Sequence, residues 1–241
     1  MPGAEAKQSF MKLVRQAAKP FAIDGWQVGS SGLRRQDPNG HWAHFWFMGS
    51  QWNYPFELSP VAGTVCPYLW RIATGKQSGE RLPAAAIGIH SSLRPLESEI
   101  YFVVSSVDVA KRPSGFPDTP VLTPDTAPGW LSDRFADFLP RLVALSSDEA
   151  LLVWLADAAE DPVPTREQAR LRYAALLARH LRRDDEVGEL LARAKLATER
   201  TVADAERRGV SLAYQSDDQD TYPQDWSHDR FCKFLAASPV D

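Results

Sequence analysis

The feature that most constrains the fold is a pair of predicted extended segments joined by a short turn, the second of which is strongly apolar. Residues 26–35 and 41–51 flank the sequence Asp-Pro-Asn-Gly at 37–40, and its Asn-Gly pair tolerates the positive φ angles that a tight β-hairpin requires. Residues 42–48 (Trp-Ala-His-Phe-Trp-Phe-Met) are apolar on both faces of the pleat apart from His44. This pattern predicts a central strand covered on both sides, or a strand with helices against one face and a groove along the other.

The residues before this hairpin have helical periodicity. Four apolar side chains share the i, i+3, i+4, i+7 spacing of one buried stripe, namely Phe10, Leu13, Val14 and Ala17. We therefore expect an amphipathic helix over residues 5–21, with its end marked by Pro20, which disfavours helical geometry at the residue before it. Three further strands are predicted, at residues 54–65, 84–91 and 99–107.

Helical patterns dominate after Trp130. Two capping boxes, at 146–149 and 165–168, predict two helix starts, because each box satisfies two backbone N–H groups. The expected helices cover residues 130–139, the segments after the two boxes, residues 184–208 with Gly209 as a left-handed cap, and residues 226–236. The fold class is therefore α+β: an N-terminal helix and antiparallel β-meander followed by a C-terminal helical region.

We divide the chain into a helix-plus-sheet module, residues 1–125, and a helical region with an acidic C-terminal tail, residues 126–241, and expect the two to form one compact unit. Between them, residues 111–129 contain five prolines, too many for a helix or a central strand. This segment is either a covalent spacer, which we favour, or a binding loop.

Charge and hydropathy limit the classes of partner. The whole chain carries 31 acidic and 27 basic residues, and residues 211–241 alone hold six acids and two bases, so the imbalance lies in the tail. A nucleic-acid-binding domain is usually basic, so we do not expect a nucleic-acid partner. No apolar run approaches the roughly 20 residues of a membrane helix, and the N-terminus lacks signal-peptide order. We expect a cytoplasmic protein with two reduced thiols, Cys66 and Cys232.

The common catalytic and cofactor motifs are absent. The sequence contains no G-x-G-x-x-G, no P-loop, no G-x-S-x-G, no H-E-x-x-H and no C-x-x-C. We therefore assign no catalytic residue, metal ligand or cofactor, although an enzyme whose residues converge only in space stays open.

The aromatic residues of the β-region form the candidate binding surface. It consists of Arg34, Trp42, His44, Trp46, Trp52 and Glu57. Tryptophan-rich sheets serve either as core or as contact surface, and both readings stay open here. His44, between two tryptophans, is a general base, a ligand-stacking group or a buried core histidine, of which we favour the last. His228 and Cys232, four residues apart, are a Cys–His pair or, as we favour, a structural contact.

Several of these segments resemble a bacterial family of unknown function. The resemblance rests on Phe10, Leu13-Val14, Lys19-Pro20-Phe21, Gly25-Trp26, residues 42–47 and the Ser-Gln-Trp-Asn at 50–53, and it covers about residues 8–155. It implies a first helix, an antiparallel β-meander and later helices, with no established activity. Some members resemble components of toxin–immunity loci, which implies a protein-binding role.

These observations favour a non-enzymatic protein-interaction module, with an immunity-like inhibitor as its sharpest form and a basic protein as its partner. The alternative is an enzyme or small-ligand-binding protein with a pocket between sheet and helices. In that case Arg34, His44, Glu57 and His90 are expected to converge on the pocket.

Overall fold

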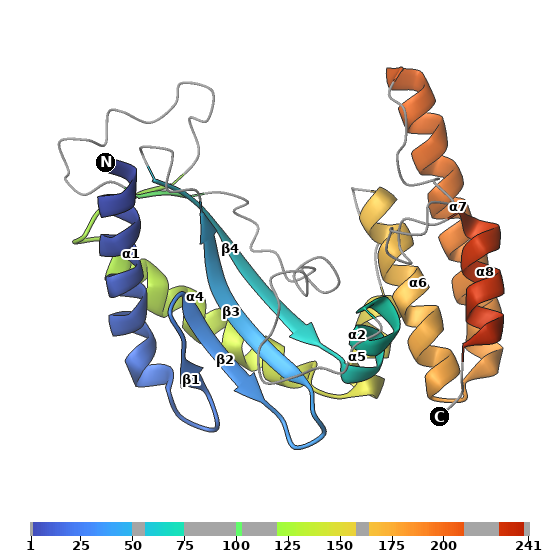
Figure 1. The fold of residues 1–241 in the computed structure, drawn as a ribbon, viewed down its shortest axis with the longest axis horizontal. Coiled ribbons are helices and arrows are strands. Elements are labelled where there is room, and N and C mark those ends of the chain that lie inside the picture. The colour runs from blue at the N-terminus through green and yellow to red at the C-terminus, as the bar shows by residue number, and fades with distance from the viewer. Residues whose placement is uncertain are drawn as a thin grey trace. The chain divides into compact units, whose positions relative to one another are not determined.

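The structure is a computed structural model that describes residues 2–49, 56–74, 100–102, 120–157, 164–209 and 227–238. Its elements, drawn in Figure 1, are α1 (Pro2–Ala18), the 3-10 turn η1 (Lys19–Phe21), β1 (Gln27–Val28), β2 (Gly32–Gln36), β3 (Trp42–Gly49), β4 (Phe56–Val65), α2 (Pro67–Thr74), β5 (Ile100–Phe102), β6 (Val121–Leu122), α4 (Ala127–Ala144), α5 (Asp148–Ala156), α6 (Pro164–His180), α7 (Asp184–Arg208) and α8 (His228–Ala237). The order confirms the α+β class, with a first helix, a β-meander and later helices.

Internal contacts divide the chain into two compact units. The first unit contains α1, the sheet and α4, and the second contains α2 and α5 to α8. Helix α4 therefore belongs with the sheet, whereas the sequence division at residue 125 grouped its residues with the helical half. The predicted strand at 84–91, the start of the proline-rich segment and most of the acidic tail lie outside the described residues. Among the described helices, none has the length and apolar character needed to cross a membrane.

Among the described residues, strand β3 lies in the middle of a six-stranded sheet whose spatial order follows the sequence, β1 to β6. Pairing is antiparallel from β1 to β5, and β6 runs parallel to β5. The longest pairing joins β3 to β4, from Trp42 opposite Val65 to Gly49 opposite Leu58. The apolar run at 42–48 is thus a strand with a neighbour on each side, as its pattern predicts.

The turn between β2 and β3 differs in detail from the expected one. Gly40 has φ +88°, but Asn39 keeps a negative φ, so the Asn-Gly pair does not form a turn with two left-handed residues. The Gly40 N–H donates to the Asp37 carbonyl at 2.8 Å, and the Asp37 N–H donates to the His41 carbonyl at 2.8 Å. The Asn39 side chain is used elsewhere, because its amide donates to the carbonyl of Ser146 at 2.7 Å.

Helices α1 and α4 pack against the same face of the sheet. Side chains of β3 alternate, and Ala43, Phe45 and Phe47 point to this helical layer. The Phe10 ring lies 5.2 Å from the Phe47 ring, edge to face, and the Phe45 ring lies 5.4 Å from that of Phe135 in α4. The predicted stripe of α1 is the one that packs here: Phe10 and Val14 are fully buried, and Leu13 and Ala17 are partly buried.

Helix α4 is longer than its sequence indicates. It begins at Ala127 rather than Trp130, with Pro128 in its first turn, and it continues past Pro140 to Ala144. Proline costs a helix one backbone hydrogen bond and usually ends it. Here Leu139 and Leu142, on either side of Pro140, are buried in the core, and this packing keeps the helix going.

Helix α6 is the central element of the second unit. It contacts α2, α5 and α7, and every side chain from Leu171 to Ala178 is buried. Helix α7 follows after a three-residue connection and ends at Gly209, whose φ of +65° confirms the predicted left-handed cap. The start of α5 is shifted by one residue from the expected box. Ser147 is its N-cap and accepts from the Ala150 N–H at 3.1 Å, so Ser146 and Glu149 do not form the predicted pair.

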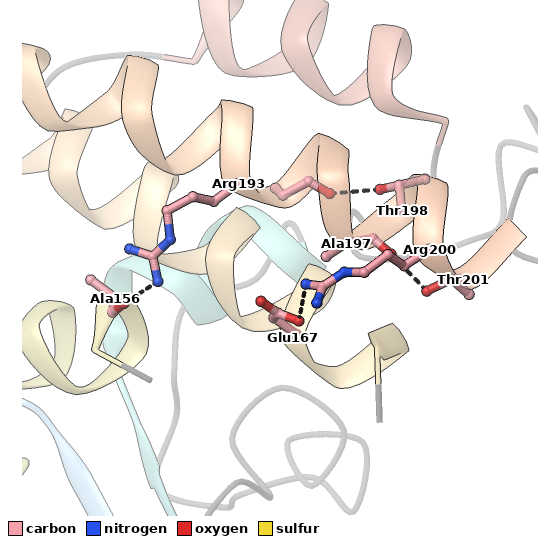
Figure 2. Close-up of polar contacts among 8 residues, drawn as sticks. Ala156, Glu167, Arg193, Ala197, Thr198, Arg200 and Thr201 are labelled. Atoms are coloured by element: carbon pink, nitrogen blue, oxygen red, sulfur yellow. Dashed lines mark hydrogen bonds and ion pairs between the residues drawn. The ribbon is translucent and has the colours of Figure 1, made fainter. Parts of the chain in front are cut away.

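Arginines of α6 and α7 fix the C-terminal end of α5. Arg193 donates to the carbonyl of Ala156 at 2.8 Å (Figure 2). Arg170 donates to the carbonyl of Asp157 at 3.0 Å. Positive charge at a helix C-terminus complements the helix dipole. Two helical turns beyond Arg193, Arg200 pairs with the buried carboxylate of Glu167 at 2.6 Å (Figure 2).

Replacement of Gly32 by alanine is expected to abolish or severely weaken folding of the first unit. A Cβ at this position would lie 1.9 Å from the Phe45 carbonyl oxygen and 2.7 Å from the Trp46 Cα, and backbone atoms cannot move aside cheaply. We expect a loss of about 3 kcal/mol or more in the free energy of unfolding, measured by urea titration. The control is Gly129→Ala, where nothing lies within 4 Å. Equal effects of the two substitutions would contradict this register.

Replacement of Arg200 by methionine is expected to cost about 1–2 kcal/mol of stability, because it leaves the Glu167 carboxylate, 9% exposed, without this ion pair. The guanidinium is itself 42% exposed, which limits the effect. Arg207→Met, which removes an exposed pair with Asp204, is the control and is expected to change stability by less than about 0.5 kcal/mol. Thermal unfolding of the two variants provides the comparison.

Candidate functional site: the groove beside the first helix

A groove of about 660 Å³ opens between α1, the β1–β2 turn and the end of β3 in the first unit. The described residues that line it are Ala4, Lys7, Gln8, Met11, Arg15, Ser30, Ser31, Phe47 and Gly49. Its volume is in the range of known ligand sites, which are about 300–1,000 Å³.

The helical repeat of α1 supplies one wall. Lys7, Met11 and Arg15 are four residues apart, so they lie along one edge of the helix, beside the buried stripe that contains Phe10 and Val14. Met11 is partly buried and packs against the core. The Arg15 side chain is held along this edge, because its Nε donates to the Met11 carbonyl at 3.2 Å.

The opposite wall is the short turn that joins β1 to β2. The Gly29 N–H donates to the Gly32 carbonyl at 2.8 Å and leaves Ser30 and Ser31 at the tip. The turn is tied to the floor, because the Phe47 N–H donates to the Ser31 carbonyl at 3.0 Å. Ser30 and Ser31 therefore line the groove together with Phe47 and the residues of α1.

The groove is electrostatically one-sided. Its described lining includes two cations, Lys7 and Arg15, and three neutral polar side chains, but no carboxylate. Arg15 is exposed and Lys7 half-buried, so both charges are available to a ligand. A floor of Met11 and Phe47 under a cationic and hydroxyl rim suits an anionic group attached to an apolar body.

The predicted aromatic surface lies elsewhere, on the face of β3 opposite α1 and α4. Trp42, His44 and Trp46 alternate with the core residues and share this face, and Arg34 is the register partner of His44 in β2. The Arg34 guanidinium lies 6.0 Å from the centre of the Trp42 ring, and the His44 ring lies 4.0 Å from that of Trp46. The structure therefore brings four of the six predicted residues together.

Most of this surface is not accessible to a partner. Trp42 and His44 are each 6% exposed, Trp46 is half-buried, and only Arg34 is exposed. Glu57 lies in β4 opposite Tyr101, but its side chain, like Trp52 and His90, is outside the described residues. None of Arg34, Trp42, His44 and Trp46 is among the described residues that line the groove.

His44 has the properties of a core histidine. Burial lowers its pKa from its ordinary value to about 3, so the imidazole is neutral throughout the physiological range. A general base works best with a pKa near the operating pH, which His44 does not have.

The His228–Cys232 pair is formed but not activated. Helix α8 places the Cys232 Sγ 3.5 Å from the His228 Nε2. Burial is the main cause of a raised pKa for the Cys232 thiol and of a lowered pKa for His228. A nucleophilic thiolate–imidazolium pair requires the opposite shift of the thiol, so a structural contact fits this pair better.

Comparison with models of protein families, with characterised proteins and with solved structures finds no match to this chain.

The groove was not predicted from the sequence. Lys7 and Arg15 lie off the buried stripe of the predicted amphipathic helix, and the signal that could single them out is their spacing around Met11. Ser30 and Ser31 carry no motif, and only the fold places them opposite α1.

The burial of His44 predicts a specific dependence of stability on pH. Since its folded-state pKa is about 3, only the unfolded state takes up this proton between pH 6.5 and 3. The contribution of the neutral His44 to the free energy of unfolding is fully present above pH 6.5. It is lost as the pH falls below this value, at up to about 1.4 kcal/mol per pH unit. The difference in unfolding free energy between the wild type and His44→Gln, from urea titrations at pH 7.5 to 5, is expected to follow this slope. A pH-independent difference would rule out a buried neutral His44.

Proposed function

We propose that the chain is a non-enzymatic protein-interaction module whose first unit binds an acidic segment of a partner protein in the groove beside α1. The observation that carries the proposal is the one-sided lining of the groove. Lys7 and Arg15 stand over an apolar floor, and the described lining contains no carboxylate.

The proposed partner differs in charge from the one that the sequence favours. The acidic tail and the aromatic residues together suggest a basic partner, but Trp42 and His44 are buried. An accessible cationic groove attracts acidic groups instead, and such charges mainly set the rate of encounter and the selectivity. The apolar floor, with Met11 and Phe47, provides burial for a hydrophobic side chain next to the acid.

A small anionic ligand is the second candidate. The volume of about 660 Å³ is typical of small-molecule sites, and the same lining suits a carboxylate or phosphate on an apolar body. This candidate retains the alternative of a pocket between sheet and helices, with Lys7 and Arg15 in place of Arg34 and His44.

The test is charge reversal within the groove. A display library of short peptides, selected on the full-length protein, is expected to yield acidic sequences that contain an apolar residue. Their affinity, measured by fluorescence anisotropy, is expected to fall about tenfold or more in Lys7→Glu/Arg15→Glu, since each exposed ion pair contributes up to about 1 kcal/mol.

The matched controls for charge are Lys12→Glu and Lys12→Glu/Lys19→Glu. Both residues are exposed, on α1 and in η1, and neither is among the described groove residues, so the double variant changes net charge equally. Equal losses in both double variants, or selection of basic peptides, would refute the proposal. Selection of no peptide, together with binding of small apolar carboxylates that depends on Arg15, would favour the second candidate.

A further inference from the structure

Three helix ends of the second unit bring together a thiol, a carboxylate and an imidazole. Cys66 directly precedes α2, Asp148 is the first residue of α5, and His180 is the last residue of α6. The Cys66 Sγ lies 3.1 Å from the Asp148 Oδ1, and the His180 Nε2 lies 3.5 Å from the Asp148 Oδ2. The carboxylate therefore stands between the other two groups and contacts both.

The surroundings fix these side chains. The His180 ring stacks on that of Tyr68, with centroids 4.0 Å apart and planes 12° from parallel. Backbone N–H groups of Tyr68 and Leu69, in the first turn of α2, hydrogen-bond to the Cys66 sulfur. Cys66 is fully buried, but the side chains of Asp148 and His180 are 24% and 22% exposed, so an ion can reach the cluster from solvent.

The cluster is not arranged as a nucleophilic site. Burial, and next the negative charge of Asp148, raise the pKa of the Cys66 thiol well above its ordinary value. A reactive cysteine requires a lowered pKa and access for a substrate, and Cys66 has neither. A thiolate next to a carboxylate becomes favourable when a cation lies between them.

We propose that Cys66, Asp148 and His180 bind a divalent transition-metal ion of the zinc type. Thiolate, carboxylate and imidazole are the three ligand types that zinc takes in proteins. Zinc–ligand bonds of 2.0–2.3 Å at tetrahedral angles place neighbouring ligand atoms roughly 3.3–3.6 Å apart. The contacts of 3.1 Å and 3.5 Å at Asp148 are close to this spacing.

Binding requires the sulfur of Cys66 and the imidazole of His180 to converge on one ion beside Asp148. The two contacts use different oxygens of Asp148, so the ion is held by both oxygens or the carboxylate rotates. On binding, the Cys66 thiol gives its proton to solvent and its sulfur bonds to the metal as a thiolate, which the N–H groups of Tyr68 and Leu69 stabilise. Stacking on Tyr68 holds the imidazole in orientation, a task that hydrogen bonds usually perform at metal sites.

Cobalt(II) reports on this site directly, because a thiolate ligand gives a near-ultraviolet charge-transfer band. The experiment titrates Co²⁺ into the full-length, metal-free protein at pH 7.5 and then displaces it with Zn²⁺. We expect one equivalent of Co²⁺ to produce the band and Zn²⁺ to abolish it. No band at tenfold excess of Co²⁺ would overturn the proposal.

The variants Cys66→Ser and Cys232→Ser test which of the two cysteines binds the metal ion. Serine keeps a hydrogen-bond donor next to Asp148, so Cys66→Ser is expected to remain folded and lose the band. Cys232→Ser, next to His228 in α8, is expected to keep it. The reverse outcome would overturn the proposal.

His180→Gln tests the imidazole ligand and the proton release. The affinity of the His180→Gln variant for Zn²⁺, measured by competition with a chromophoric chelator, is expected to be at least about tenfold lower than that of the wild type. In the wild type the affinity is expected to rise with pH by about tenfold per unit, because one thiol proton leaves on binding. An unchanged affinity in His180→Gln, or a pH-independent affinity, would contradict this set of ligands. These readouts do not involve the groove of the first unit, so they are independent of the proposed function.

Discussion

The structure of the first unit depends on the requirement that β3 be buried on both faces. Phe45 and its neighbours on one face need the layer formed by α1 and α4, and Trp42 and His44 on the other face are equally buried. Burial on that face also decides the chemistry of His44, which stays neutral. Backbone pairing holds β2 close to β3, and Gly32, opposite Trp46, has no room for a side chain.

The groove lies at the border of this core. Helix α1 presents Phe10 to the sheet, and the neighbouring edge, with Lys7 and Arg15, remains outside the packed layer. Residues at such a border contribute little to stability, so they can be selected for binding without cost to the fold. By contrast, Trp42 and His44 are part of the packing and are constrained by it.

The elements that local chemistry determines were predictable from the sequence. The stripe of α1 and the cap at Gly209 follow from spacing and from the freedom of glycine. The predictions that fail concern positions where tertiary packing or an unexpected hydrogen-bond partner decides the local structure. Helix α4 continues through Pro140 because its flanking leucines are buried, and Asn39 serves as a donor to Ser146 in place of a left-handed turn residue.

The sites were less predictable than the elements because they combine residues from distant segments. Cys66 and Asp148 are 82 residues apart, and no spacing rule connects a residue before one helix to the first residue of another. His180 has the context of a solvated helix face in the sequence, and its stacking on Tyr68 follows only from the packing of α2 against α6. Whether an aromatic strand is core or contact surface likewise depends on what covers it.

The way α5 ends has a consequence for how this protein can diverge. Most helices are terminated by the residues that follow them, so the next loop is under constraint. Here Arg170 and Arg193, from two other helices, bind the last carbonyls of α5. The position where α5 ends therefore depends on residues far along the chain, and a natural variant that replaces Arg170 or Arg193 loses one of these two bonds.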